Sequence, residues 1–261
     1  MKTEEISNFY DLKKRVFGKT SGTICHYTSY ESLIMILKNR SLRLSRYDLM
    51  NDIAEKQLSK CDDGDCRYIA SFTGTTSEKV AMWALYGKHS SLKLRLSFSR
   101  AALIGTTNDN FYFDSKKTQK IPSEETVLSD YSKKDFTLSD VVYYDRTKNK
   151  LKLSGKTLPI MSVEQSMINE LAGTIKYDAW EYERESRLAV VLHKNTHIGQ
   201  FSDISHVYVG LNEEFIQKLV VTYSPWITDE IFEELRNSID SLAGYELSHK
   251  RSSLQGEIGE L

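Results

Sequence analysis

The chain has 261 residues, of which 40% are hydrophobic and 27% are charged, so it is long enough to bury a sizeable core. Its formal net charge of −1 excludes a global positive field that would attract nucleic acid or anionic membrane, although lysines can still gather locally. Three cysteines, an acidic N-terminus and the absence of a long apolar run predict a cytoplasmic protein without a membrane segment. We expect a single domain over 1–261.

The first hundred residues alternate between short helices and short strands. Apolar spacing, turn residues and capping side chains define these elements. The expected elements, in chain order, are a helix over Ile6–Phe17 capped by Ser7 or Asn8, a strand over Thr23–Ser29, a helix over Tyr30–Asn39 capped by Ser29, strands over Ser41–Ser45 and Arg67–Thr73, a helix over Glu78–Tyr86 and a strand over Leu92–Phe98.

Residues 101–156 are polar and rich in lysine, and they predict an insertion that is mostly loop. Its firmest strand is Ser139–Tyr144. Long polar insertions often carry specificity for a partner or substrate, so these lysines either form a local basic surface or are simply solvated.

A helix over Ser162–Lys176 is expected to lead into a strand that starts at Trp180 and ends at Leu192. Because strand side chains alternate between faces, one face would carry Glu181, Glu183, Glu185 and Arg187. Such a cluster either lines a reactive cleft or forms a charge ladder that protects an edge strand from aggregation.

The remaining residues predict further short elements and no metal site. Neither Cys61–Cys66 nor the pair His193 and His197 completes a ligand set for zinc or calcium. The expected elements are a strand over Ile204–Gly210, a helix over Asn212–Lys218, an extended segment over Val220–Tyr223, a helix over Asp229–Leu242 capped by Thr228, and a frayed tail over His249–Leu261.

Several motifs together resemble a family of uncharacterised bacterial proteins. They are H-Y-T-S, the S-L-R-L-S strand with its N-D loop, S-F-T, M-W-A-L-Y-G and W-E-Y-E-R-E-S-R. That family is similar to the ADP-ribosyltransferase fold with its His–Tyr–Glu triad. The resemblance implies an α+β fold with a split β-sheet core and flanking helices, and it implies NAD as the co-substrate.

The resemblance also assigns roles to individual residues. His26 would hold the adenosine ribose, Tyr86 would stack on nicotinamide with Tyr47 as a competing candidate, and Glu185 or Glu183 would be catalytic. A carboxylate bonded to the ribose 2-hydroxyl strengthens its bond as positive charge develops on the sugar. The other implied NAD-binding residues are Tyr27, Thr28, Ser45, Asn51, Trp83 and Arg187.

The sequence therefore predicts an ADP-ribosyltransferase that modifies a macromolecule, either protein, RNA or DNA. It would act as a toxin of a bacterial toxin–antitoxin or phage-defence system, with an antitoxin protein as a possible partner. The alternatives are an NAD glycohydrolase that uses the same pocket with water, and a non-catalytic interaction module. No G-x-G-x-x-G sequence occurs, so a Rossmann-type dinucleotide site is not expected.

Overall fold

The computed structural model describes residues 8–50, 66–86, 92–106, 111–115, 136–153, 156–158, 163–192 and 204–259, with the backbone alone at 111–115, 156, 192 and 204. The chain divides into two compact units, which we describe separately. Unit 1 comprises Met1–Thr20, Arg43–Ser71 and Phe111–Tyr208, and unit 2 comprises Ser21–Leu42, Phe72–Asn110 and Val209–Leu261.

Unit 2 is built on strand β4 (Lys93–Ser99), which has a partner on each side. β1 (Thr23–Ser29) pairs with it antiparallel, and so does β13 (Val220–Tyr223) on the opposite edge. β14 (Ser248–Lys250) then adds to β13 in parallel. The strand predicted over Leu92–Phe98 is confirmed as β4, in which Leu94, Leu96 and Phe98 are buried and Arg95 is buried as well.

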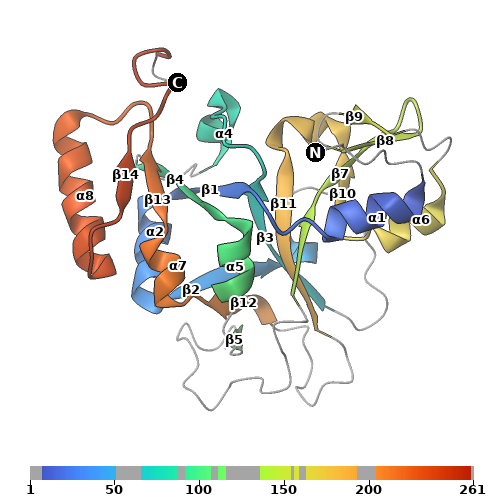
Figure 1. Ribbon diagram of the computed structural model, residues 1–261, viewed down its shortest axis with the longest axis horizontal. Helices are drawn as coiled ribbons and strands as arrows, with labels where there is room; N and C mark the ends of the chain where they lie inside the picture. Colours follow the sequence, from blue (N-terminus) through green and yellow to red (C-terminus); the bar gives the residue numbers. More distant parts are fainter. Residues whose placement is uncertain are drawn as a thin grey trace. The chain divides into compact units, whose positions relative to one another are not determined.

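Five helices lie in the described part of unit 2, and local capping explains where three of them begin. Ser29, Asn212 and Thr228 each accept a hydrogen bond from a backbone N–H in the first turn of the helix that follows. Figure 1 shows α8 lying beside β13 and β14. The helices are α2 (Tyr30–Asn39), α5 (Arg100–Thr106), α7 (Glu213–Gln217) and α8 (Asp229–Ala243), and the short α4 (Val80–Leu85) lies between β3 and β4 in the chain.

Unit 1 contains strands around β11 (Glu185–Leu192), which pairs with β3 (Cys66–Thr73) and, antiparallel, with β6 (Phe136–Asp140). β2 (Ser41–Arg46) pairs antiparallel with β3 and is followed by the 3₁₀ turn η1 (Tyr47–Leu49). β12 (Ile204–Gly210) and β5 (Phe111–Ser115) follow β2 in the strand order.

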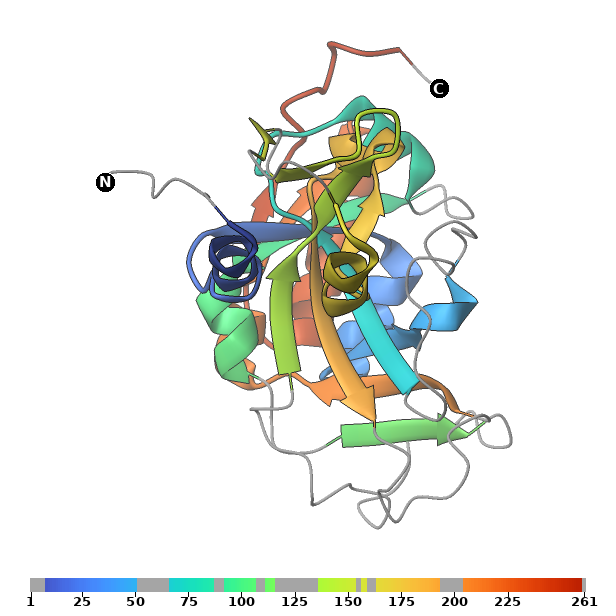
Figure 2. The same cartoon turned by 90° about the vertical axis from the view of Figure 1, so that its right-hand side faces the viewer.

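A second, four-stranded sheet of unit 1 has one apolar and one charged face. Its order is β10 (Ile175–Tyr177), β7 (Val142–Asp145), β8 (Lys150–Leu153) and β9 (Lys156–Thr157). The apolar face packs against α1 (Phe9–Phe17) and α6 (Gln165–Glu170), which lie near each other in both views (Figures 1 and 2). The buried core consists of Leu12, Val16, Val142, Leu151, Leu153, Leu158, Ile168, Leu171 and Ile175.

Several predicted elements differ from the structure. The helix expected over Ser162–Lys176 ends at Glu170, because Gly173 turns the chain with a φ of 79° and β10 follows. The expected strand Ser139–Tyr144 is divided at Val141 into β6 and β7. The described part of the polar insertion contains β5, β6, β7, β8 and the first residue of β9, so it holds more strands than predicted. The helix α5, which extends into it, was not predicted.

The C-terminal residues also differ from the frayed tail that was predicted. Ser248–Lys250 form β14, and the chain after it is anchored by hydrogen bonds of Ser252 and Ser253. The predicted α+β class is confirmed. No helix among the described residues is long and apolar enough to cross a membrane.

Candidate active site

Glu183 and Glu185 lie in unit 1 on either side of a sharp break in the backbone. Residues Asp178–Glu183 form the 3₁₀ turn η4, and β11 begins at Glu185. Arg184 between them adopts the left-handed conformation, with φ 45° and ψ 53°. The prediction of a continuous strand from Trp180 to Leu192 is therefore wrong for its first part, because η4 occupies that part and β11 begins only at Glu185.

Glu185 and Arg187 form a bidentate ion pair on one face of β11, as their spacing predicted. Arg187 Nε donates to Glu185 Oε1 at 2.8 Å and Nη2 donates to Oε2 at 2.9 Å. Arg187 Nη1 also donates to the carbonyl of Gly173 at 2.9 Å. The Arg187 side chain has no exposed area and that of Glu185 is 5% exposed, so both charges are removed from water.

Lys176 joins the two glutamates into one cluster. Its Nζ donates to Glu183 Oε2 at 2.7 Å and to Glu185 Oε2 at 3.3 Å. Lys176 comes from β10, on the face of the four-stranded sheet opposite to its apolar core. We call Lys176, Glu183, Glu185 and Arg187 the charged cluster. With two cations and two carboxylates, it can be buried without net charge.

The cations of the charged cluster keep the Glu185 carboxylate ionised. Burial alone would raise the pKa of Glu185, but the positive charges of Arg187 and Lys176, with hydrogen bonds from Arg187 and Ser71, lower that pKa to about 2. Burial would lower the pKa of Lys176, but Glu185 and Glu183 outweigh it and raise the pKa. Glu185 and Lys176 are thus both charged at neutral pH.

Neighbouring groups fix the position of the start of β11. Tyr143 Oη accepts a hydrogen bond from the backbone N–H of Glu185 at 2.8 Å, and burial followed by the charge of Glu185 raises the pKa of Tyr143. On the other face of the strand, Ser186 Oγ donates to Asp140 Oδ1 at 2.7 Å. The backbone of Glu185 is therefore fixed by Tyr143, while its side chain faces Lys176 and Arg187.

Aromatic rings border the charged cluster. Lys176 Nζ lies 4.7 Å from the ring of Trp180, a cation–π contact, and the rings of Trp180 and Tyr182 are 6.2 Å apart. Both rings are partly exposed. The predicted residue Tyr47 is buried, and Arg187 Cζ lies 5.7 Å from its ring centroid.

The other candidates in unit 1 are not brought into this cluster by any described contact. Ser45 lies in β2 opposite Ile69 of β3. Asn51 lies outside the described residues. Within the parts of the chain that the structure describes, no three His, Cys, Asp or Glu side chains are placed to hold a metal ion.

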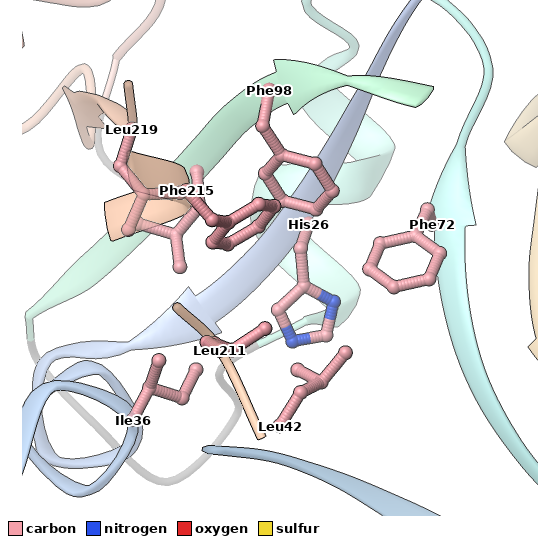
Figure 3. Close-up of a pocket in the computed structure, with 9 residues that line it drawn as sticks. His26, Ile36, Leu42, Phe72, Phe98, Leu211, Phe215 and Leu219 are labelled. Atoms are coloured by element: carbon pink, nitrogen blue, oxygen red, sulfur yellow. The ribbon is translucent and has the colours of Figure 1, made fainter. Parts of the chain in front are cut away.

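His26 lies in unit 2 and faces a small apolar pocket (Figure 3). Its ring centroid is 5.6 Å from that of Phe72. Every other side chain of the pocket is apolar, so within the pocket His26 alone offers a hydrogen bond to a ribose. These residues are Ile36, Leu42, Phe72, Leu96, Phe98, Leu211, Phe215 and Leu219.

Tyr27 and Trp83 pack together on the opposite face of β1 from His26. Their rings meet edge to face with centroids 4.8 Å apart. Alternation along the strand places the buried Thr28 on the His26 face. Tyr86, the residue implied to stack on nicotinamide, lies outside α4, because the helix ends at Leu85 and Tyr86 caps it in an extended conformation. Tyr27 and Trp83 therefore cannot share the His26 pocket.

Comparison with known families matches residues 82–188 to a protein family of unknown function, DUF2971. No curated protein and no solved structure was found to match. The matched stretch includes Trp83 and all four residues of the charged cluster, but it ends before β12 and begins after His26.

Sequence reasoning missed Lys176 and Tyr143. The helix predicted over Ser162–Lys176 ends at Lys176, although this lysine interrupts the short β-leaning run Thr174–Tyr177, in which its neighbours are apolar or aromatic. Tyr143 was placed in a strand but given no role. A lone lysine inside an apolar run is the signal that could have indicated a buried partner for the glutamates.

Proposed function

We propose that the chain is an ADP-ribosyltransferase that transfers ADP-ribose from NAD to a macromolecule, with Glu185 as its catalytic carboxylate. The observation that carries this proposal is the charged cluster, in which Lys176 bridges Glu183 and Glu185 while Arg187 binds Glu185 with two hydrogen bonds. Strongly perturbed ionisable groups in close contact are typical of functional sites.

A purely structural role explains this cluster less well. Burying four charged groups costs free energy, and a buried ion pair is often no more stabilising than apolar side chains of similar size. The E-x-E-x-R arrangement also brings together the groups that the reaction needs: one carboxylate kept ionised and a second carboxylate bound to the same lysine.

The chemistry follows from these assignments. The bond between C1 of the ribose and the nicotinamide nitrogen breaks, and both of its electrons leave with nicotinamide, which becomes neutral. Positive charge develops on the ribose, where an ionised Glu185 would stabilise it through the 2-hydroxyl. The acceptor then forms a bond to C1, and Glu183 would take the acceptor's proton.

The assignment requires the cluster to rearrange when substrate binds. Both oxygens of Glu185 accept hydrogen bonds from cations, and Lys176 makes the longer of them at 3.3 Å. Lys176 is therefore the contact that is expected to yield to the ribose. Trp180 and Tyr182, which are partly exposed beside Lys176, offer rings to an incoming base.

The first experiment measures release of nicotinamide from NAD by the purified protein, alone and with cell lysate. We expect release only with lysate, its loss in Glu185→Gln, and labelled ADP-ribose on protein, RNA or DNA. Release without lysate would instead identify an NAD glycohydrolase. No release and no NAD binding under either condition would leave a non-catalytic interaction module.

Glu183→Gln is the matched variant, since it removes a carboxylate bound to the same lysine. It should retain part of the activity if Glu183 serves the acceptor. Thermal unfolding of both variants has to be measured first, because neutralising one carboxylate leaves a buried cation short of a partner. Growth arrest on expression, relieved by Glu185→Gln, would test the toxin role.

A further inference from the structure

Glu78 of unit 2 accepts hydrogen bonds from two hydroxyl groups of the chain's own C-terminal segment. Ser252 Oγ donates to Glu78 Oε2 at 2.5 Å, and Ser253 Oγ donates to Oε1 at 2.9 Å. The backbone N–H of Ser253 adds a third bond, to Oε1 at 2.8 Å. Two hydroxyls on the two oxygens of one carboxylate reproduce the way in which a carboxylate binds a vicinal diol.

Glu78 is surrounded by other buried polar and aromatic side chains of unit 2. Trp83 Nε1 donates to Glu78 Oε2 at 3.0 Å, which orients the carboxylate, and Arg95 Nη2 lies 3.9 Å from Oε1. The side chains of Glu78 and Arg95 are 4% and 10% exposed. Tyr27 packs on Trp83, so one carboxylate, one guanidinium and two rings are gathered within unit 2.

One buried polar atom at this site, Arg95 Nε, has no hydrogen-bond partner among the described residues. Arg95 is only 8% exposed as a whole residue. A buried donor without a partner destabilises the fold, so this atom needs an explanation. An anionic ligand oxygen beside Glu78 would supply that partner, because a guanidinium N–H favours an anionic acceptor.

We propose that Glu78, Arg95, Tyr27 and Trp83 form a binding site for a ribose phosphate, free or within a nucleotide, and that Ser252 and Ser253 occupy the place of its diol. The ligand's two hydroxyls would replace the serine hydroxyls on Glu78, and its phosphate would bind Arg95. This inference concerns binding in unit 2 and does not depend on ADP-ribosyl transfer by the charged cluster.

The C-terminal segment is tethered on both sides of the two serines, so it can leave Glu78 without leaving the unit. Arg251 Nη2 lies 2.6 Å from Asp229 Oδ1, and Trp226 Nε1 donates to the carbonyl of Gly259 at 2.7 Å. Before them, β14 pairs with β13 (Figure 1). Displacement of Ser252 and Ser253 therefore has to open only the stretch between these anchors.

The test measures binding of AMP, ribose 5-phosphate and 2′,3′-dideoxy-AMP to the full chain by calorimetry. The variant Ser252→Ala/Ser253→Ala removes the competing hydroxyls, and Ser248→Ala, at an exposed residue of β14, is its matched control. We expect the double variant to bind AMP and ribose 5-phosphate at least tenfold tighter than the wild type and the control. The dideoxy nucleotide should gain nothing, and adding Glu78→Gln should abolish the gain.

Equal affinity of the wild type and the double variant for AMP, or equal affinity for AMP and its dideoxy analogue, would overturn the proposal. Binding of AMP but not ribose 5-phosphate would restrict the ligand to nucleotides and support it. Amide hydrogen exchange on the wild type gives a readout without substitutions: saturating AMP should speed exchange at Ser252 and Ser253. Unchanged exchange at these residues would contradict displacement of the serines.

Discussion

Arg187 holds Glu185 through two parallel hydrogen bonds while its third donor group binds the carbonyl of Gly173. The guanidinium thereby connects the start of β11 to the turn before β10. A lysine carries the same charge but cannot form this fork.

We therefore expect Arg187→Lys to lower the free energy of unfolding by about 3 kcal/mol, measured by urea denaturation. Arg236→Lys is the control, because Arg236 pairs with Glu246 at 2.8 Å on the surface and should cost below about 1 kcal/mol. Equal effects of the two changes would show that burial adds nothing to the Arg187 pair.

The low pKa of Glu185 predicts acid sensitivity. A carboxyl whose pKa falls from 4.5 in the unfolded chain to about 2 in the folded one stabilises the fold above about pH 4.5. That contribution, about 3 kcal/mol, is lost as the pH falls towards 2. Unfolding measured between pH 6 and pH 2 should show a steeper loss in the wild type than in Glu185→Gln, and parallel curves would contradict the assignment.

Lys176→Met should destabilise the protein by about 3–5 kcal/mol, because it leaves two carboxylates facing each other without their shared cation. One of them should then take up a proton near neutral pH, which carboxyl ¹³C NMR would detect as a raised pKa.

Lys152→Met is the matched control for Lys176. Lys152 also contacts two acids of the same 3₁₀ turn, Asp178 at 3.0 Å and Glu181 at 3.3 Å, but its side chain is 19% exposed. Partial solvation should limit its cost to about 1 kcal/mol. A similar loss from both changes would mean that the charged cluster is an ordinary surface network.

Leu151→Ala should cost about 2–5 kcal/mol, since Leu151 is fully buried in the core between the four-stranded sheet, α1 and α6. Leu85→Ala, at a residue that is 37% exposed, should cost much less. Thermal unfolding of both variants checks the prediction, and an equal loss would contradict the position of this core.

Arg184→Gly should stabilise the fold or leave it unchanged, because the left-handed conformation of Arg184 costs a residue with a Cβ about 1 kcal/mol. Arg184→Val should destabilise it, since a β-branched residue tolerates this conformation poorly. Urea denaturation of both variants tests the backbone geometry of the break without changing a charged-cluster residue.

The elements that sequence predicted well carry their signals locally. The bounds of β1 and α2 are predicted as they occur, because β1 ends at the helix cap Ser29, whose side chain accepts a hydrogen bond from Ser32 N. The elements that sequence did not predict have bounds that depend on contacts between residues far apart in the chain. The apolar spacing of Val163, Ile168 and Ile175 suits a longer helix, but the chain turns at Gly173 with a φ of 79°. The Arg67 side chain lies where a Cβ at this position would be, so the turn depends on a distant segment.

The candidate site was predictable to the extent that it depends on spacing within one strand. Glu185 and Arg187, two residues apart in β11, were expected on one face and are found there. Lys176 reaches them from another strand, and Ser253 reaches Glu78 across 175 residues. No local pattern specifies such contacts, since they depend on how distant segments pack.

The left-handed residue between the two glutamates changes how an E-x-E sequence is to be interpreted. Within a strand, any two residues at that spacing lie on the same face, whatever residue stands between them. Here the spacing spans the exit from a 3₁₀ turn, so the middle position has to accept a positive φ, for which Gly, Asn and Asp are the natural alternatives to Arg184. Among related chains, that substitution pattern would distinguish a shared turn from a chance pair of acids.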